Sequence, residues 1–466
     1  MSVPARLPFP LTDAGTAEEL MRRHGHVFRY VPVWKSWMAY DGARWARDEY
    51  GALPRVMVAM LRRIVDEAQR IEDAELRSKL IGHAIRYESA NRIDAVLRLA
   101  RHIPGVAVSH DVFDASPMLL NVANGTLDLT TGELRAHQAE DLLTKMCPVA
   151  WDPESPCPRW ERFLFEIFAG GEELIAYIQR AVGYSLSGDT REQCLQLGYG
   201  HGSNGKSVFL EVLQSLFGDY GAQADFATFL DGKTDGPRND VARLAGARMV
   251  RSSEVGEGKR FNESLVKALT GSETIAARFL YSEAFEFRPT FKLWFAANHK
   301  PVIRGTDHAI WRRVRLIPFT VQFSDDRKDK QLKDKLLAEL PGILAWAVAG
   351  CLLWQERGLE PPEDVLAATQ EYRRDSDVIG SFLDDCCDVG PGTEVAASDL
   401  YRAFKAWAKE NGEFELSQTA FGRRLDERGF GVRKLGTKRR VGLRLLPNFP
   451  APVQKSDTST LFGHAH

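Results

Sequence analysis

Apolar and polar residues follow helical and extended periods in turn along the first third of the chain. Between residues 54 and 69, apolar side chains recur three and four positions apart, which predicts an amphipathic helix. Short apolar runs at residues 30–33 and 37–40, before the turn pair Asp41-Gly42, predict strands. Residues 119–129 hold apolar residues on both sides of an Asn-Gly pair, which is typical of a hairpin. We therefore expect an α+β domain over residues 1–150.

The middle of the chain has a pattern that predicts an α/β core. Prolines at positions 153, 156 and 158 mark a domain edge, and a helical pattern then extends from Trp160 to Leu186. A strand–loop–helix unit begins at Gln193, the α/β pattern ends near Gln322, and helices continue to about Arg374. We expect a helical linker over residues 151–190 and an α/β core with C-terminal helices over residues 191–375.

The pattern beyond residue 376 predicts a smaller, basic unit. Ser398–Glu410 reads as a helix, Ser417 is suited to cap a second helix that ends at Glu427, and residues 429–446 form two short strands. From residue 428 to 446 the chain has seven basic residues and no acid. Two helices and a basic hairpin suggest a winged helix over residues 376–447. The expected DNA contacts are Arg433, Lys434, Lys438, Arg439 and Arg440; a solvated charged edge is the alternative.

Composition narrows the class of protein. The 466 residues are 44% hydrophobic and 27% charged with a net charge of −2, which is typical of a globular protein and gives no overall nucleic-acid signature. The six cysteines have no zinc-ligand spacing, which favours buried thiols. The longest apolar run, Leu340 to Trp354, is shorter than a membrane span, and no secretory signal is evident. Residues 448–466 lack an apolar period and are expected to be disordered. We expect a soluble intracellular protein with no membrane partner.

One loop predicts nucleotide binding. Residues 200–207, Gly-His-Gly-Ser-Asn-Gly-Lys-Ser, fit the pattern G-x-x-x-x-G-K-[ST] between a strand and a helix. Glycines let backbone N–H groups surround phosphates, and the helix N-terminus adds its positive dipole end. Lys206 would reach the β and γ phosphates, and Ser207 would complete a Mg²⁺ shell. The expected binding residues are Gly200, Gly202, Ser203, Asn204, Gly205, Lys206 and Ser207; a glycine-rich turn before a helix is the alternative.

Three later features suit triphosphate hydrolysis. A short strand ends at Glu254, an acid able to hold the metal or polarise water. An apolar strand over residues 291–298 ends at Asn298, which is suited to hold the attacking water. Arg312 and Arg313 offer fixed positive charge for the transferring phosphoryl group. The alternatives are a turn residue before Pro301 for the asparagine and a solvated strand edge for the arginines.

In this order, the motifs resemble those of the superfamily 3 helicases, and more closely those of the phage and plasmid primase-helicase family, which includes the poxvirus primase-helicase. Asn298 is followed by His299-Lys300-Pro301, as in the family's Asn-His-x-Pro pattern. The resemblance implies an AAA+ core over residues 191–375 and a hexameric ATP-driven ring whose active sites lie between subunits. The matching stretches are residues 119–134, 200–207, 244–254, 266–271, 291–301 and 311–319.

The resemblance also implies roles for single residues at the ATP site. Lys206 and Ser207 would bind phosphate and Mg²⁺, Glu254 would be the Walker B acid, and Asn298 the sensor. Arg313, with Arg312 as the alternative, would be the arginine finger presented to the neighbouring subunit. Many superfamily 3 members have two adjacent acids, whereas Val255 follows Glu254 here, and Glu257 is an alternative second acid.

The predicted hairpin over residues 274–288 would line the pore of such a ring. Lys267 and Arg278 are the expected contacts to the backbone of single-stranded DNA, since a pore that moves along any sequence needs charge rather than base readout. An ordinary surface hairpin is the alternative. Residues 1–150 resemble the family's helicase-associated domain.

The sequence therefore predicts an ATP-dependent DNA helicase of a phage, plasmid or integrated element, acting on single-stranded and duplex DNA in the cytoplasm of a bacterial host. Residues 1–150 hold no Asp-x-Asp pair followed by a histidine, which is the primer-synthesis site of the family, so a separate primase is an expected partner. The alternative is a winged-helix DNA-binding regulator that uses its P-loop as a nucleotide switch. Stimulation of ATP turnover by single-stranded DNA separates the two.

Overall fold

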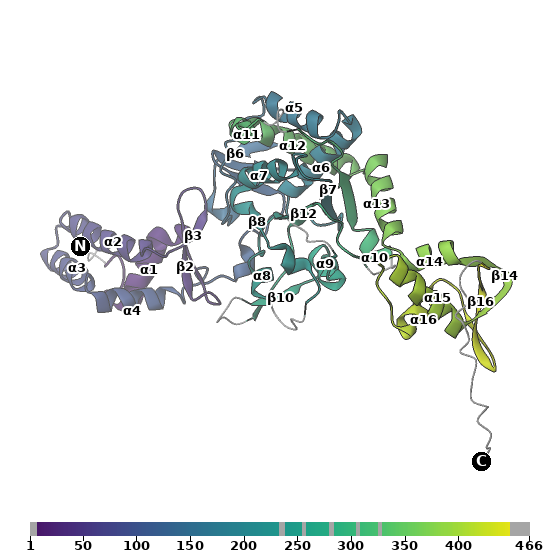
Figure 1. Ribbon diagram of the computed structural model, residues 1–466. Helices are drawn as coiled ribbons and strands as arrows, with labels where there is room; N and C mark the ends of the chain where they lie inside the picture. The colour runs from purple at the N-terminus through teal and green to yellow at the C-terminus, as the bar shows by residue number, and fades with distance from the viewer. Residues whose placement is uncertain are drawn as a thin grey trace, which may run out of the picture. The chain divides into compact units, whose positions relative to one another are not determined.

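A computed structural model describes residues 7–232, 238–253, 258–278, 284–303, 308–324 and 329–447 (Figure 1). It forms two units, one with residues 1–301 and 312–366 and the other with residues 302–311 and 367–466. Glu254 and Glu257, the tip of the predicted pore hairpin and the C-terminal tail lie outside the described residues. None of the described helices is long and apolar enough to span a lipid bilayer.

The first part of the larger unit is a helical cluster with two small antiparallel sheets. Apolar residues on one face of α2, among them Met57, Met60 and Ile64, are buried, so the predicted amphipathic helix is confirmed. The hairpin at the Asn-Gly pair is confirmed as well. The helices are α1 (Asp13–His24), α2 (Ala52–Ala68), α3 (Ala74–Tyr87) and α4 (Ala90–Ala100). The strands are β1 (Phe28–Val31), β2 (Ser36–Tyr40), β3 (Trp45–Arg47), β4 (Leu119–Val122), β5 (Gly125–Asp128) and β6 (Glu133–Arg135).

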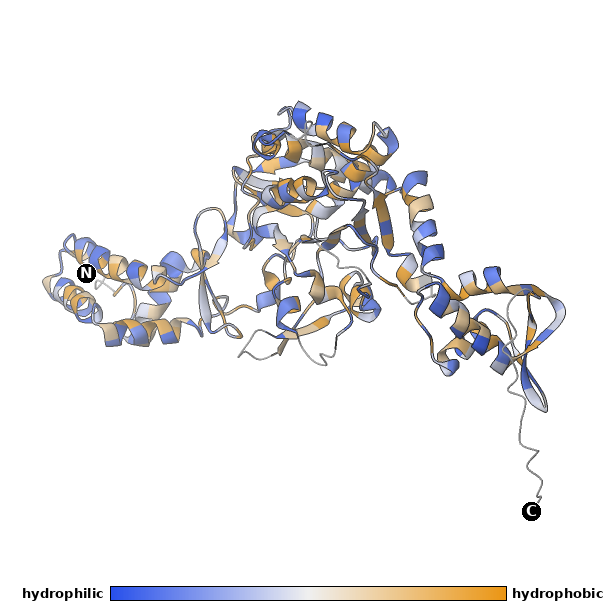
Figure 2. Ribbon diagram, viewed as in Figure 1, coloured by the Kyte–Doolittle hydropathy of each residue, from blue (hydrophilic) through white to orange (hydrophobic). Residues whose placement is uncertain are grey.

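A five-stranded parallel sheet forms the centre of the larger unit, with strand order β13-β7-β12-β9-β8. Its middle strand, β12, is a continuous apolar run after Lys292, as expected where both faces of a parallel sheet are covered, and all six of its residues are buried. Figure 2 shows hydrophobic residues along these strands. The strands are β7 (Leu195–Tyr199), β8 (Gly221–Gln223), β9 (Met249–Ser253), β12 (Lys292–Ala297) and β13 (Val314–Pro318). The predicted α/β core is confirmed.

Helices cover one face of this sheet, and aromatic rings fill the other. A Cβ on Gly183 of α6 would lie 2.1 Å from the backbone nitrogen of Cys351 in α12, so glycine permits these two helices to touch. On the opposite face, Phe226, Phe229 and Phe261 surround Phe295 of β12. The helices of the core are α5 (Pro158–Ile167), α6 (Glu172–Leu186), α7 (Lys206–Phe217), α8 (Asn239–Ala242), α9 (Glu263–Leu269), α11 (Leu332–Leu337) and α12 (Leu340–Arg357). A separate hairpin joins β10 (Ile275–Arg278) and β11 (Ala284–Phe287).

The smaller unit packs three helices on a three-stranded antiparallel sheet of order β14-β16-β15. Phe382, Phe404 and Phe421, one from each helix, meet in its core. The elements are α10 (His308–Trp311), α14 (Val378–Cys386), β14 (Cys387–Ala396), α15 (Ala397–Glu410), α16 (Gln418–Glu427), β15 (Val432–Leu435) and β16 (Thr437–Leu445), and α13 (Glu363–Asp375) leads into them. The predicted helices and terminal hairpin are confirmed. The sequence pattern did not predict β14.

Candidate active site

The predicted phosphate loop lies at the carboxyl end of β7 and leads directly into α7. Its shape needs two of its glycines for close packing. A Cβ on Gly200 would lie 2.2 Å from the carbonyl oxygen of Phe319, and one on Gly205 would lie 2.6 Å from Ile167 Cγ2. Gly205 also has φ +86°, and Ser203 has φ +63°. By contrast, a Cβ on Gly202 would have no atom within 4 Å and would face open space.

Lys206 is held inside the loop by neutral acceptors. The side chain is 5% exposed, and its Nζ donates to the Gly200 carbonyl at 2.6 Å and to Asn204 Oδ1 at 3.0 Å. Asn204 is itself buried and donates through Nδ2 to the Phe319 carbonyl at 3.5 Å. Burial lowers the pKa of the Lys206 ammonium to about 8. Because the acceptors that fix this lysine carry no charge, its positive charge remains available to an anion.

The other residues predicted at this site follow neighbouring strands at the same edge of the sheet. Gly200 donates its N–H to the carbonyl of Ala297 at 3.3 Å, which places the exposed Asn298, the next residue, beside the loop. Ser253 ends β9 and pairs with Ala296, so the chain enters the undescribed segment that begins at Glu254 from this same edge. Ser207 is exposed in the first turn of α7. Hydroxyl and carboxylate oxygens are the donors that Mg²⁺ prefers.

The two predicted arginines lie at the opposite edge of the sheet. They precede β13, whose first residue, Val314, pairs with Leu195 at the start of β7. The five residues of β7 separate this edge from the phosphate loop by about 16 Å. Arg312 is exposed and donates through Nη2 to Gln193 Oε1 at 2.8 Å. Arg313 is 8% exposed and donates through Nε to Thr270 Oγ1 at 3.1 Å. The arrangement directs neither guanidinium to the phosphate loop of its own chain.

Lys267 and Arg278 are the two residues expected to touch DNA in the pore. Lys267 is half-buried in α9. Arg278 is exposed at the end of β10, where it pairs with Ala284 of β11, and the connecting turn lies outside the described residues. The predicted hairpin is therefore present, with Arg278 beside its turn.

The basic hairpin of the smaller unit carries less free charge than its sequence suggests. Glu394 of β14 pairs with Arg433 at 3.1 Å and with Arg439 at 3.3 Å. Arg440 is 6% exposed and donates to Asp426 and to the carbonyls of Phe430 and Gly422, so its side chain holds α16 and the hairpin together. This burial assigns Arg440 a structural role, and we do not propose it as a DNA contact.

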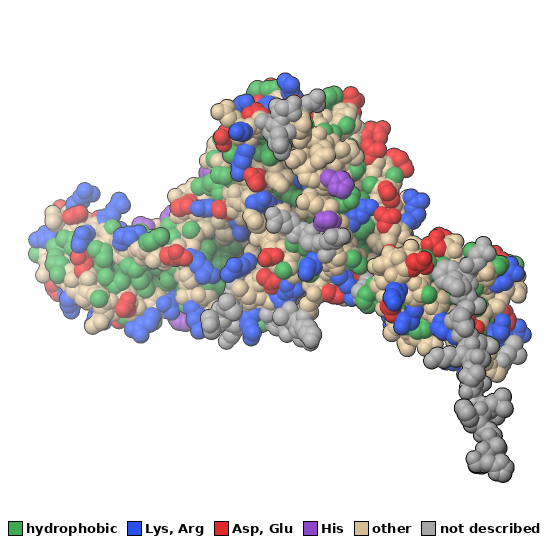
Figure 3. All heavy atoms as spheres, in the orientation of Figure 1, with side chains coloured by type: hydrophobic (Ala, Val, Ile, Leu, Met, Phe, Trp, Pro, Cys, Tyr) green, Lys and Arg blue, Asp and Glu red, His purple; other side chains and the backbone are tan. Residues whose placement is uncertain are grey.

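Lys434 and Lys438 are the two lysines of this hairpin, and they lie at its exposed end. They face each other across β15 and β16, beside the turn at Gly436, and both are exposed. On the face that Figure 3 shows, Lys and Arg side chains are interspersed with acidic ones. The two lysines at the hairpin end are therefore the strongest phosphate-contact candidates of the five predicted in this unit.

Sequence reasoning missed three neighbours of the site. Phe319 closes the loop through its backbone and its ring, and Gln193 and Thr270 hold the two arginines. Thr270 and Phe319 lie within stretches that match the family, but the sequence does not mark any of the three as a neighbour of the site, because each contacts a residue that is distant in the sequence. All six cysteines are buried and unbonded, which confirms that expectation. No group of three or more His, Cys, Asp or Glu side chains suited to a metal lies within the part of the chain that the structure describes.

Comparison with protein families gives three matches in chain order. Residues 17–169 match the family described as D5 N terminal like, residues 198–313 match a family of unknown function, and residues 374–430 match the family described as poxvirus D5 protein-like. The first and third models both describe D5 proteins, so the chain is similar to the D5-type primase-helicases over these two stretches. The family is similar to the superfamily 3 helicases, as the order of the motifs predicted.

Proteins similar to this chain include viral ones. The chain is 28% identical over 325 residues to "Putative helicase L207/L206" of Acanthamoeba polyphaga mimivirus, covering 64% of this chain and 34% of the relative. It is 23% identical to "Putative helicase 022R" of Frog virus 3, covering 86% of this chain and 55% of the relative. The chain thus spans between a third and about half of the length of these two proteins.

A solved structure shares the fold. The apo structure of the NrS-1 C terminal region superposes with a TM-score of 0.54 at 13% sequence identity, covering 93% of this chain and all of the other.

Proposed function

We propose that the chain is the ATP-driven motor of a DNA helicase that works as a ring, because its phosphate loop and its exposed arginine lie at opposite edges of one sheet. The loop with Lys206 supplies one half of an ATP site, and Arg312 supplies charge that its own loop cannot use. Copies arranged head to tail would bring these two halves together at each seam. A hexamer follows from the resemblance to superfamily 3.

The proposed chemistry uses the groups at the two edges. The loop N–H groups and Lys206 bind the phosphates, Asn298 orients the attacking water, and the neighbour's arginine stabilises charge on the transferring phosphoryl group. We assign this last role first to Arg312, because its guanidinium is exposed, and second to Arg313, which is buried against Thr270. Ser207 and Glu254 are the proposed ligands of Mg²⁺, which would neutralise phosphate charge.

The proposed DNA contacts lie in two places. Lys267 and Arg278 would grip single-stranded DNA through its backbone in the pore. In the smaller unit, the order helix, strand, two helices and a two-stranded hairpin fits a winged helix, with α16 in a groove of duplex DNA and Lys434 and Lys438 on phosphates. Gln418 and Thr419, which are exposed at the start of α16, would face that groove. Arg433 and Arg439 remain secondary candidates.

The proposed domain organisation follows the sequence prediction, with a helicase-associated domain at residues 1–150, a linker at 151–190, an AAA+ core at 191–375 and a winged helix at 376–447. We further propose that the motor serves replication of a phage, plasmid or integrated element in a bacterial cell, with a separate primase. A nucleotide-switch regulator is the second candidate, because it too would combine a phosphate loop with a winged helix.

One pair of assays tests the proposal. ATP turnover of the purified chain is measured with and without single-stranded DNA, and strand displacement is measured on a forked duplex, with Lys206→Ala as the inactive control. The proposal expects DNA to stimulate turnover and ATP to drive displacement, both of which Lys206→Ala abolishes. ATP turnover that is unchanged by single-stranded DNA, together with no strand displacement, would favour the nucleotide-switch regulator.

A further inference from the structure

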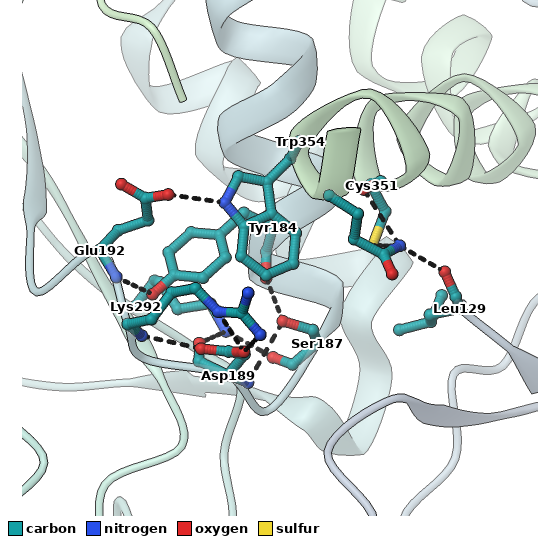
Figure 4. A network of polar contacts seen from close by, with 10 residues as sticks. Leu129, Tyr184, Ser187, Asp189, Glu192, Lys292, Cys351 and Trp354 are labelled. Carbon is teal, nitrogen blue, oxygen red and sulfur yellow. Dashed lines mark hydrogen bonds and ion pairs between the residues drawn. The ribbon is translucent and has the colours of Figure 1, made fainter. Parts of the chain in front are cut away.

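The segment that joins α6 to β7, residues 187–194, forms a platform at the arginine edge of the sheet. Figure 4 shows the polar contacts that hold it. Lys292, at the start of β12, is buried and donates from Nζ to the carbonyls of Ser187 and Asp189. Farther along the segment, Glu192 accepts a hydrogen bond from Trp354 Nε1 at 2.9 Å. These bonds reach both ends of the segment from two other elements of the core, so its backbone has little freedom.

Gln193, the residue after Glu192, has a backbone conformation that is uncommon for its type. Its φ is +48°, and its N–H closes a turn onto the carbonyl of Thr190 at 3.1 Å. Glycine adopts a positive φ without steric cost, whereas a glutamine there is strained. Strained residues of this kind concentrate at functional sites. A glutamine in place of glycine at this position suggests that its side chain has a role.

That side chain holds Arg312. Gln193 Oε1 accepts from Arg312 Nη2 at 2.8 Å, and Arg315 Nη1 donates to the Arg312 carbonyl at 2.8 Å, so both the head and the backbone of this exposed arginine are fixed. The partner is a neutral amide. In the same platform, Arg191 is paired with the Asp189 carboxylate at 2.5 Å, and its charge is therefore neutralised. The amide, by contrast, orients Arg312 and leaves its positive charge in place.

We propose that Gln193 is a positioning residue that holds the Arg312 guanidinium ready for the phosphates of a neighbouring subunit's nucleotide. The inference rests on the proposed function, because it needs Arg312 to act across a seam. A long, exposed arginine loses rotamer freedom when it engages a phosphate, and a bond already formed to the platform lowers that cost. Gln193 touches the arginine and no reacting atom.

The test replaces Gln193 by glycine in the full chain. Gln193→Gly relieves the strained backbone and removes the amide, so we expect a melting temperature equal to or above that of the wild type. We also expect kcat for DNA-stimulated ATP turnover to fall about three- to ten-fold with KM for ATP unchanged, as for loss of one hydrogen bond of ordinary strength. Gln193→Glu keeps the bond but neutralises the guanidinium, and it should lower kcat as well.

A matched control removes the same kind of bond elsewhere. Gln223 Oε1 accepts from Arg251 Nη2 at 2.7 Å, and Gln223→Ala should leave kcat at the wild-type value. A further check is the double variant Gln193→Gly with Arg312→Ala, which should be no slower than Arg312→Ala alone, since the two residues act as one unit.

Two results would overturn the inference, and they are distinguishable. If Arg312→Ala loses turnover while Gln193→Gly keeps the wild-type kcat, Gln193 has no positioning role and the proposed function stands. If Arg312→Ala itself keeps the wild-type kcat, the seam role of this arginine fails, and the inference fails with it.

Discussion

The buried lysine of the phosphate loop gives a prediction that depends on pH. Lys206 must be charged to bind phosphate, yet burial lowers the pKa of its ammonium from the ordinary 10.5 to about 8. Bound phosphates stabilise the charged form and raise that pKa again. Above pH 8, ATP binding is therefore coupled to uptake of a proton by Lys206. The affinity for ATP is fully present below this pH and is lost as the pH rises through it.

The size of the effect follows from the shifted value. At pH 9, one unit above a pKa of about 8, only about one-tenth of the free protein carries the proton on Lys206. The Kd for ATP should therefore be about ten-fold higher at pH 9 than at pH 7, equivalent to about 1.4 kcal/mol of binding free energy. With a pKa of 10.5, affinity would hardly change over the same range.

The assay is an equilibrium titration with a fluorescent, non-hydrolysable ATP analogue at constant excess Mg²⁺. Lys206→Arg is the matched control, because a guanidinium stays charged throughout this range, and its Kd, although weaker, should be flat. A wild-type Kd that is equal at pH 7 and pH 9 would refute the argument that the loop desolvates this lysine.

Two further predictions concern the glycines of the loop and the basic hairpin. Gly200→Ala should abolish ATP binding, because its Cβ would lie 2.2 Å from a backbone oxygen, whereas Gly202→Ala meets no atom and should change Kd less than about two-fold; isothermal titration compares them. Lys434→Ala with Lys438→Ala should weaken duplex DNA binding about ten-fold at low salt and reduce the salt slope by about two, with an unchanged melting temperature. Arg440→Ala should instead lower the melting temperature of the smaller unit, and a normal melting curve with weak DNA binding would contradict our assignment.

The local pattern of the sequence predicts the parallel core and the phosphate loop well. Buried parallel strands are short continuous apolar runs, and the loop motif stands between one such run and a helix, so both are visible within a few residues. β14 was missed because Gly390, Pro391 and Gly392 interrupt it, and the register indeed shifts between Val389 and Glu394. Residues of this kind indicate a loop when they are read without the partner strand.

Roles that depend on distant partners are not visible in the sequence. The basic stretch after residue 428 has no acid of its own, yet Glu394 and Asp426, from other elements, pair with three of its arginines. Likewise, Arg312 and Arg313 are neighbours in sequence and look equivalent. They differ in burial, because Arg312 points outward to Gln193 whereas Arg313 points inward to Thr270.

The most direct test of the account mixes two inactive variants. Lys206→Ala has an intact Arg312, and Arg312→Ala has an intact phosphate loop. A ring assembled from both variants therefore contains some seams at which an intact phosphate loop meets an intact Arg312. We predict that the mixture recovers DNA-stimulated ATP turnover that neither variant has alone, and Arg313→Ala mixed in parallel compares the second candidate. A mixture no more active than the sum of its parts, with assembly confirmed by mass, would contradict an active site shared between subunits.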